Sequence, residues 1–120
     1  MDQKNIAILA AKALDAKRAK DITVLKVDEM TVITDYMVIA TGRSVPQVKA
    51  LADNVEEELG KAELDPKRRE GYTEGRWCVL DYGDVMVHVF HEQDREYYQL
   101  ERLWADGTNE VQVDYDAEEA

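Results

Sequence analysis

Residues 77–90 read W-C-V-L-D-Y-G-D-V-M-V-H-V-F, and this stretch decides how the chain folds. Two β-rich runs flank residues 82–84, where Gly83 can adopt the positive φ that a hairpin turn requires. Folding the stretch back on itself pairs positions of the same parity. One face then carries Cys78, Leu80, Tyr82, Val85, Val87 and Val89, and the other carries Trp77, Val79, Asp81, Met86, His88 and Phe90. Neither face is polar enough to be left in water, so we expect one face to be covered and the other to be covered or engaged by a partner.

The rest of the chain predicts a single α/β domain around this hairpin. Apolar residues at helical spacing indicate helices over residues 2–19 and from Ser44 to about residue 59, and Gln47 completes a capping box with Ser44. Residues 22–27 and 36–41 are typical of strands that form an antiparallel hairpin. A last helix over residues 94–104 is expected to place Tyr97, Leu100 and Trp104 on one side. The order α-β-β-α-β-β-α predicts a mixed β-sheet packed with three helices, in which the strands at 36–41 and 77–82 run parallel.

Length and composition limit the class of protein. The chain has 120 residues, 45% of them hydrophobic and 34% charged, as in an ordinary globular domain. It contains no apolar run near 18 residues, and its first residues lack the apolar region of a signal peptide. The one cysteine, Cys78, excludes an internal disulfide and suits a reducing cytoplasm.

The net charge of −11 is concentrated at one end. Residues 106–120 carry six acids and no base, so we expect a domain over residues 1–105 followed by an acidic, disordered tail. An acidic surface disfavours non-specific nucleic-acid binding and favours basic protein partners. Lys17, Arg18 and Lys20 at the end of the first helix fit a solvated helix terminus, which is commoner than a nucleic-acid patch.

No constellation of residues predicts catalysis, a metal site or a cofactor. His88 and His91 are three apart on a strand and point to opposite faces, and Cys78 lies on the face opposite His88, so three zinc ligands cannot be assembled. Asp81 and Asp84 fit ordinary turn chemistry. The glycine-rich phosphate and nucleophile motifs are absent from the sequence.

Residues 77–90 closely resemble the signature of the ribosomal silencing factor family, the Iojap-related proteins. Residues 17–27, 34–44 (TDYMVIATGRS) and 95–104 (REYYQLERLW) resemble the same family in the same order, so the match covers about residues 5–105. Glu63 stands where the family usually has a glycine. The resemblance implies a nucleotidyltransferase-like fold and a cytoplasmic factor that binds the large ribosomal subunit at ribosomal protein uL14. Such a factor blocks joining of the subunits, represses translation under nutrient limitation, and forms a homodimer when free.

The alternative is a nucleotidyltransferase-like enzyme or nucleotide-binding protein. Gly42, Arg43 and Ser44 supply part of the junction that such enzymes need, but the following strand offers only Asp81 as a metal-binding carboxylate. We therefore predict a non-catalytic binding module.

The partner contact is expected on the second hairpin face and its turn, because aromatic anchors supply a desolvated centre and carboxylates attract a basic partner. The predicted partner-binding residues are Glu70, Trp77, Asp81, Tyr82, Asp84, Met86, His88 and Phe90. Trp77 and Phe90 could instead be core residues beneath a helix.

Overall fold

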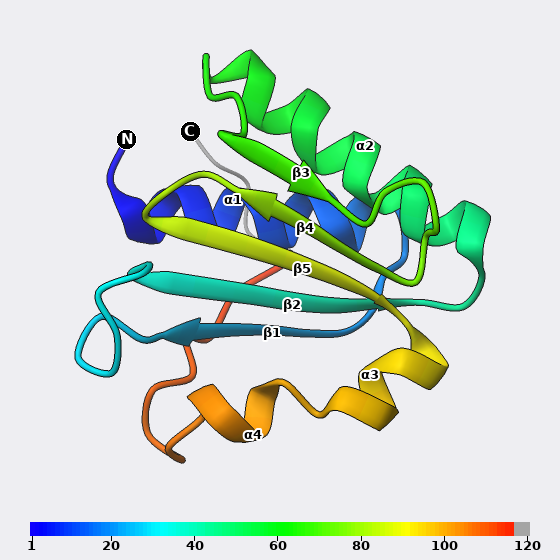
Figure 1. The fold of residues 1–120 in the computed structure, drawn as a ribbon. Helices are drawn as coiled ribbons and strands as arrows, with labels where there is room; N and C mark the ends of the chain where they lie inside the picture. The colour runs from blue at the N-terminus through cyan, green and yellow to red at the C-terminus, as the bar shows by residue number, and fades with distance from the viewer. Residues whose placement is uncertain (117–120) are drawn as a thin grey trace.

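The structure, a computed structural model, describes residues 1–116. Five strands form one sheet in the order β1-β2-β5-β4-β3. The strands are β1 (Lys20–Lys26), β2 (Tyr36–Gly42), β3 (Arg68–Glu70), β4 (Trp77–Asp81) and β5 (Val85–His91). The helices are α1 (Gln3–Ala16), α2 (Val45–Lys61), α3 (Glu92–Tyr98) and α4 (Glu101–Trp104). The predicted α/β class and single mixed sheet are confirmed (Figure 1).

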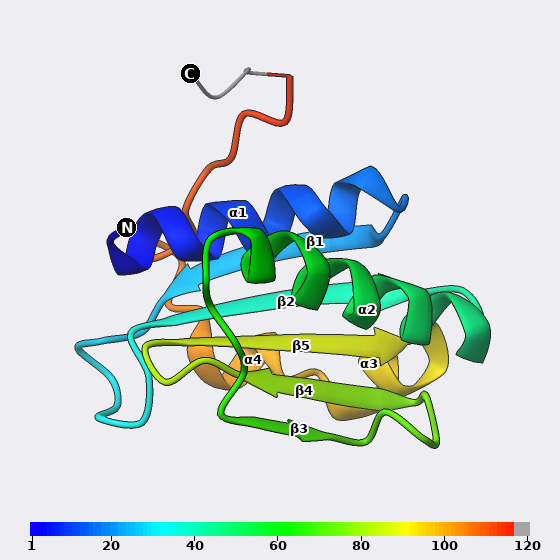
Figure 2. The ribbon, with the colours of Figure 1, turned by 90° about the horizontal axis from the view of Figure 1, so that it is seen from above.

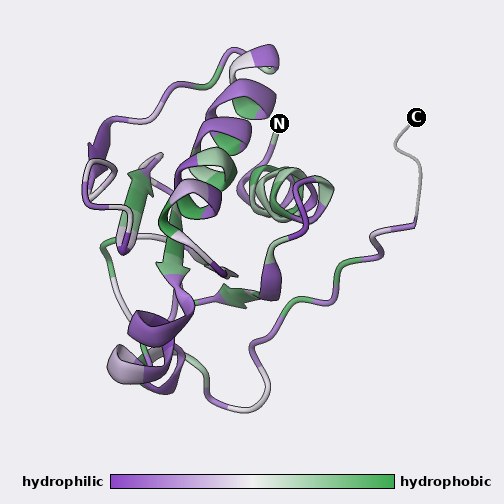
Figure 3. Cartoon of the chain, turned by 90° about the vertical axis from the view of Figure 1, so that its right-hand side faces the viewer, coloured by the Kyte–Doolittle hydropathy of each residue, from purple (hydrophilic) through white to green (hydrophobic). Residues whose placement is uncertain are grey.

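Helices α1 and α2 lie together on one face of the sheet, and the short helices α3 and α4 lie on the other (Figure 2). Strand β2 is buried along its whole length, as its apolar run predicts. The first core cluster fills the space between the sheet and α1 and α2, and it includes Leu14, Val38, Leu51 and Val87. A smaller cluster beneath α3 and α4 contains Leu25, Val27, Met37, Ile39 and Phe90. The apolar side of each long helix faces the sheet, and its polar side faces outward (Figure 3).

The predicted parallel pair is wrong in one respect. Strand β2 pairs in parallel with β5, whereas β4 lies beyond β5 and runs antiparallel to it. The cause is strand β3, which pairs antiparallel with β4 and was not predicted, because its three residues are charged and exposed. This additional strand runs in the same direction as β2 and reverses the chain once more before β4 begins, so β4 is antiparallel to β2 and β5 is the parallel strand that pairs with it.

The predicted helix over residues 94–104 is also corrected. It consists of α3 and α4, which meet at Gln99 in the left-handed conformation with φ of 49°. The break turns the second segment, so that Leu100 and Trp104 pack against the smaller cluster while Tyr97 remains 80% exposed.

The segment after α4 continues along the open edge of β1. The backbone N–H of Lys26 donates to the carbonyl of Asn109, and the N–H of Val111 donates to the carbonyl of Val24. Val111 and Val113 also pack against the larger core cluster. The disordered tail expected from residue 106 is therefore wrong for residues 109–111, which pair with β1; the expectation for residues 117–120 lies outside the described residues.

Candidate docking surface

The hairpin pairs as its parity predicts. Trp77 lies opposite Phe90, Val79 opposite His88, and Asp81 opposite Met86. The face with Cys78 and Leu80 is buried under α1 and α2. The other face is only partly covered, because α3 and α4 reach the end that carries Trp77 and Phe90 and leave the end that carries Asp81 and Met86 open.

The open end of this face forms a small groove, which we call the β3–β5 groove. It has a volume of about 40 Å³ and is lined by Arg68, Glu70, Val79, Asp81 and Met86. A guanidinium nitrogen of Arg68 lies 3.4 Å from the Asp81 carboxylate and another lies 4.0 Å from Glu70. The structure thus brings together Glu70, Asp81 and Met86, three of the predicted contact residues, around one cation.

Trp77 lies on the same face as the groove, at the end that α3 and α4 cover. Its indole stacks on Phe90 with ring centroids 4.8 Å apart, and the Tyr98 ring lies 4.9 Å from it on the outer side. Phe90 is fully buried, so it is a core residue and not a contact residue. Trp77 is half-buried and remains accessible beside Tyr98, which is 50% exposed.

His88 lies beneath this surface and not on it. It is 5% exposed, and its Nδ1 accepts a hydrogen bond from the Trp77 indole N–H over 3.1 Å. Its Nε2 is buried and has no hydrogen-bond partner among the described residues. Burial lowers the pKa of His88 to about 4, so the imidazole is neutral at pH 7. His88 therefore orients the Trp77 indole from beneath the surface.

Tyr82 is separated from the predicted contact residues. It has the parity of Cys78 and Leu80, so its ring packs against the core cluster under α1 and α2, and burial raises the pKa of its hydroxyl. Asp84 is exposed at the tip of the turn, where its carbonyl accepts hydrogen bonds from the N–H groups of Asp35 and Tyr36. These bonds place the β1–β2 loop directly beside the β4–β5 turn.

Sequence reasoning missed two groups of exposed apolar residues outside the groove. The α3–α4 segment exposes Tyr97, Tyr98 and Leu103, and the β1–β2 loop exposes Met30, Val32 and Ile33. The spacing of Val32 and Ile33 in the sequence does not indicate that their side chains are exposed. Only the tertiary structure identifies them as surface.

The thiol of Cys78 is fully buried, and burial raises its pKa to about 11. Within residues 1–116, no group of three or more His, Cys, Asp or Glu side chains is placed to hold a metal ion.

A larger hollow of about 530 Å³ lies between the start of β1 and α3–α4. Arg95 lines this hollow, and its side chain is 11% exposed. Its guanidinium donates to the carbonyl of Asp21 and to the hydroxyls of Thr23 and Thr41. Glu101 accepts from its Nε at 3.4 Å. These bonds fasten α3 to the sheet, so Arg95 has a structural role.

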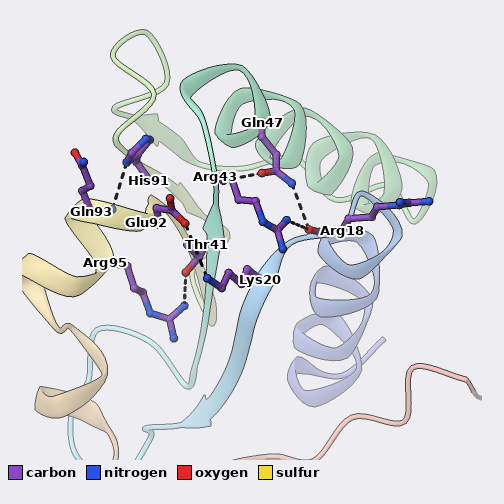
Figure 4. A network of polar contacts seen from close by, with 9 residues as sticks. All are labelled: Arg18, Lys20, Thr41, Arg43, Gln47, His91, Glu92, Gln93 and Arg95. Atoms are coloured by element: carbon purple, nitrogen blue, oxygen red, sulfur yellow. Dashed lines mark hydrogen bonds and ion pairs between the residues drawn. The ribbon is translucent and has the colours of Figure 1, made fainter.

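The junction between β2 and α2 is capped from within (Figure 4). The Ser44 hydroxyl accepts from the N–H of Gln47, as the capping box predicts, and the Gln47 Oε1 accepts from the N–H of Arg43. Pro46 contributes no N–H. Few backbone donors therefore remain for a nucleotide phosphate at this helix N-terminus.

The fold and the surface define a small α/β domain with one sheet face partly open to a partner. A family model described as "Ribosomal silencing factor during starvation" matches residues 1–120. The chain belongs to this ribosomal silencing factor family, which is a regulatory family associated with the ribosome.

Individual relatives agree. The chain is 43% identical over 106 residues to the ribosomal silencing factor of Bacillus subtilis, covering 88% of this chain and 90% of that protein. It is 31% identical over 104 residues to the chloroplastic protein Iojap of Zea mays, covering 87% of this chain and 45% of that protein. A crystal structure of a Chromobacterium violaceum protein superposes with a TM-score of 0.86 at 38% identity, covering 97% of each chain. The likeness to nucleotidyltransferases stays a prediction.

In residues 1–116, no helix has the length and hydropathy needed to cross a membrane.

Proposed function

We propose that this protein binds the large ribosomal subunit at ribosomal protein uL14 through the β3–β5 groove and the adjoining aromatic residues Trp77 and Tyr98. Bound there, it blocks joining of the subunits and represses translation in the cytoplasm under nutrient limitation. The observation that carries the proposal is the half-exposed Trp77–Tyr98 pair, which lies beside an open apolar and acidic groove in a chain of the ribosomal silencing factor family.

The chemistry of the groove suits a basic protein. Half-buried Trp77 and Met86 supply area that is desolvated on contact, and Tyr98 supplies a second aromatic anchor. Glu70 and Asp81 lie at the rim, and Asp84 lies at the neighbouring turn. Arg68 at present lies between two of these carboxylates, and a lysine or arginine of the partner could replace it at the same oxygens.

The test uses two matched aspartate substitutions. Met86→Asp introduces a charge into the groove, and Ala50→Asp introduces the same charge on the exposed side of α2, at the opposite face of the sheet. After circular dichroism has shown that both variants keep the fold, each is sedimented with purified large subunits and titrated against isolated uL14. We expect Met86→Asp to weaken both interactions at least tenfold (about 1.4 kcal/mol) and Ala50→Asp to bind as the parent does.

The functional consequence is tested by mixing small and large subunits in the presence of each variant. The parent and Ala50→Asp are expected to reduce the fraction of joined ribosomes, and Met86→Asp is expected not to. Equal binding by folded Met86→Asp would show that the groove is the wrong surface.

We also propose a homodimer of the free protein. The exposed side chains of Tyr97, Tyr98 and Leu103 on α3–α4 form a half-apolar surface that suits an isologous contact. Light scattering at tens of micromolar, roughly the range that populates an interface with a Kd near 1 μM, is expected to give a dimer mass. A strict monomer would contradict it.

The nucleotide-binding alternative predicts heat on titration with a nucleoside triphosphate and Mg²⁺. The internally capped junction at Ser44 and Gln47 argues against it. A silent calorimetric titration would remove this alternative.

A further inference from the structure

A group of cations lies away from the β3–β5 groove, at the end of the molecule where α1 ends and α2 begins. It consists of Lys17, Arg18, Lys20 and Arg43, all with exposed side chains, and we call it the basic patch. The residues come from three separate elements: the end of α1, the start of β1 and the β2–α2 junction. Figure 4 shows the Arg43 guanidinium reaching the backbone carbonyl of Arg18, while the Arg18 side chain extends outward and Lys20 points toward Glu92.

Hydrogen bonds connect two of the segments that carry the basic patch. Arg18 adopts the left-handed conformation with φ of 63°, and its carbonyl accepts hydrogen bonds from the Arg43 guanidinium at 3.5 Å and from the Gln47 amide at 3.3 Å. These bonds fix the α1–β1 connection against the β2–α2 junction. The positive end of the α2 macrodipole adds to the same potential.

Acidic residues, among them Asp21, Glu92 and Glu96, line the same hollow as Lys20, whereas Lys17, Arg18 and Arg43 lie outside it. Glu92 lies 4.0 Å from Lys20, but both side chains are about half exposed, and such a pair contributes little in water. In a chain with a net charge of −11, this gathering of cations contrasts with the rest of the surface. Like charges held together repel one another, and a polyanion would relieve that repulsion.

We infer that the basic patch faces the phosphate backbone of ribosomal RNA when the protein is docked on the large subunit. The inference rests on the proposed function. A large subunit is a polyanion, so an acidic domain bound to one of its proteins is repelled by nearby phosphates unless its RNA-facing side is basic. The domain measures only 31 × 31 × 29 Å, so no part of its surface is far from the subunit on which it docks.

The local geometry favours a phosphate backbone over a single bound phosphate. The Ser44 hydroxyl and the Gln47 side chain occupy backbone donors at the start of α2, and Pro46 lacks one, so no ring of N–H groups surrounds a single anion. Four exposed side chains spread over three elements instead match several phosphates at successive positions.

The test compares two double variants with the same change in charge. Lys17→Gln with Lys20→Gln removes half of the basic patch and one weak ion pair. Lys4→Gln with Lys61→Gln removes two exposed lysines from the far ends of α1 and α2, together with the comparable Lys61–Glu58 pair. Affinity for purified large subunits and for isolated uL14 is measured for both doubles and the parent between 50 and 300 mM salt (roughly the range over which phosphate contacts dominate the salt dependence).

The patch double is expected to bind large subunits on the order of tenfold more weakly at about 0.1 M salt, with a salt slope smaller by about 1.5, since each phosphate contact contributes roughly 0.7–0.9. Its affinity for isolated uL14 should equal that of the control double. Equal affinity and slope for the two doubles on large subunits would overturn the inference while leaving the uL14 proposal intact. A parent that binds neither subunits nor uL14 would overturn both.

Discussion

The Trp77 indole N–H donates a hydrogen bond to Nδ1 of His88 across the β4–β5 hairpin, with 3.1 Å between the nitrogens. Because Nδ1 accepts, the neutral imidazole carries its proton on Nε2, which is buried and unpartnered among residues 1–116. One buried side chain thus orients the aromatic residue that the proposed docking surface depends on. Two predictions concern this pair directly, and three more concern the end of α2, the C-terminal segment and Tyr98.

Stability should fall when His88 is protonated. Its pKa is about 4 in the folded protein, compared with 6.5 ordinarily, because burial disfavours the charged form. The unfolded chain therefore takes up a proton at a higher pH than the folded chain. Above pH 6.5 the imidazole is neutral in both states, and the free energy of unfolding does not depend on its titration. As the pH falls from 6.5 toward 4, the free energy of unfolding decreases by up to about 1.4 kcal/mol per pH unit.

Urea unfolding of the parent and of His88→Phe at pH 7.0, 5.5 and 4.5 isolates this contribution (pH values chosen to span roughly the window between the two pKa values). The carboxylates titrate in both proteins, so the difference between them reports on His88. A difference that does not change with pH would show that the imidazole titrates normally.

Removing both partners of the Trp77–His88 bond should cost less than the sum of removing each one alone. Trp77→Phe keeps a ring against Phe90 but leaves Nδ1 of His88 buried without a donor, at about 1–3 kcal/mol. Adding His88→Leu removes the unpaired acceptor, so the double variant should be more stable than the sum of the single losses predicts. A double-mutant cycle by urea unfolding measures the coupling, expected to be about 1 kcal/mol. Additive losses would mean that the hydrogen bond contributes nothing.

A glycine at residue 63 should stabilise the protein. Glu63 has φ of 64° and follows Ala62, the C-cap residue of α2. Its N–H donates to the carbonyl of Gly60, and the N–H of Leu64 donates to that of Leu59, which forms a Schellman motif. The left-handed conformation is strained for a side chain with a Cβ, so Glu63→Gly should raise the free energy of unfolding by about 0.5–1 kcal/mol. Glu57→Gly, in the exposed interior of α2, should lower it by about 1 kcal/mol. The same sign for both would contradict this.

Sequence patterns predicted those parts of the fold in which local preference and tertiary packing agree. The hairpin register at residues 77–90 follows from parity alone, and the α2 cap follows from Ser44 and Gln47. Strand β3 could not be predicted, because Arg68 and Glu70 have no apolar face and the strand forms only by pairing with β4. The break at Gln99 was missed because no glycine or proline marks it.

The surface was predicted less completely than the fold. Parity placed Asp81 and Met86 correctly, but it could not show that α3 and α4 cover Phe90 and leave Trp77 partly accessible. Burial of His88 depends on the same covering. The contribution of Tyr98 arises from the turn at Gln99, and no spacing in the sequence reports that turn.

The segment at residues 109–113 should contribute to stability by covering the β1 edge. Val111 pairs with Val24 and packs against the core, so Val111→Asp should cost about 1–3 kcal/mol, whereas the same residue introduced at exposed Gln112 should change stability by about 0.5 kcal/mol or less. Thermal unfolding of both variants measures the two changes in stability. Identical melting temperatures would show that the edge strand does not depend on this segment.

The last prediction concerns Tyr98, the residue that the structure adds to the predicted contact surface. Its ring lies 4.9 Å from Trp77 and is 50% exposed, so Tyr98→Ala should leave most of the core intact and cost about 1 kcal/mol or less of stability. If the ring is an anchor for uL14, the same change should weaken binding at least tenfold, because a central aromatic residue contributes about 2 kcal/mol or more to an interface. Tyr115→Ala, which removes a tyrosine 37% exposed on the C-terminal segment, is the matched control and should bind as the parent does. Titration of isolated uL14 with both variants separates the outcomes: equal weakening would indicate a general effect of losing a tyrosine, and no weakening by Tyr98→Ala would exclude the aromatic pair from the contact.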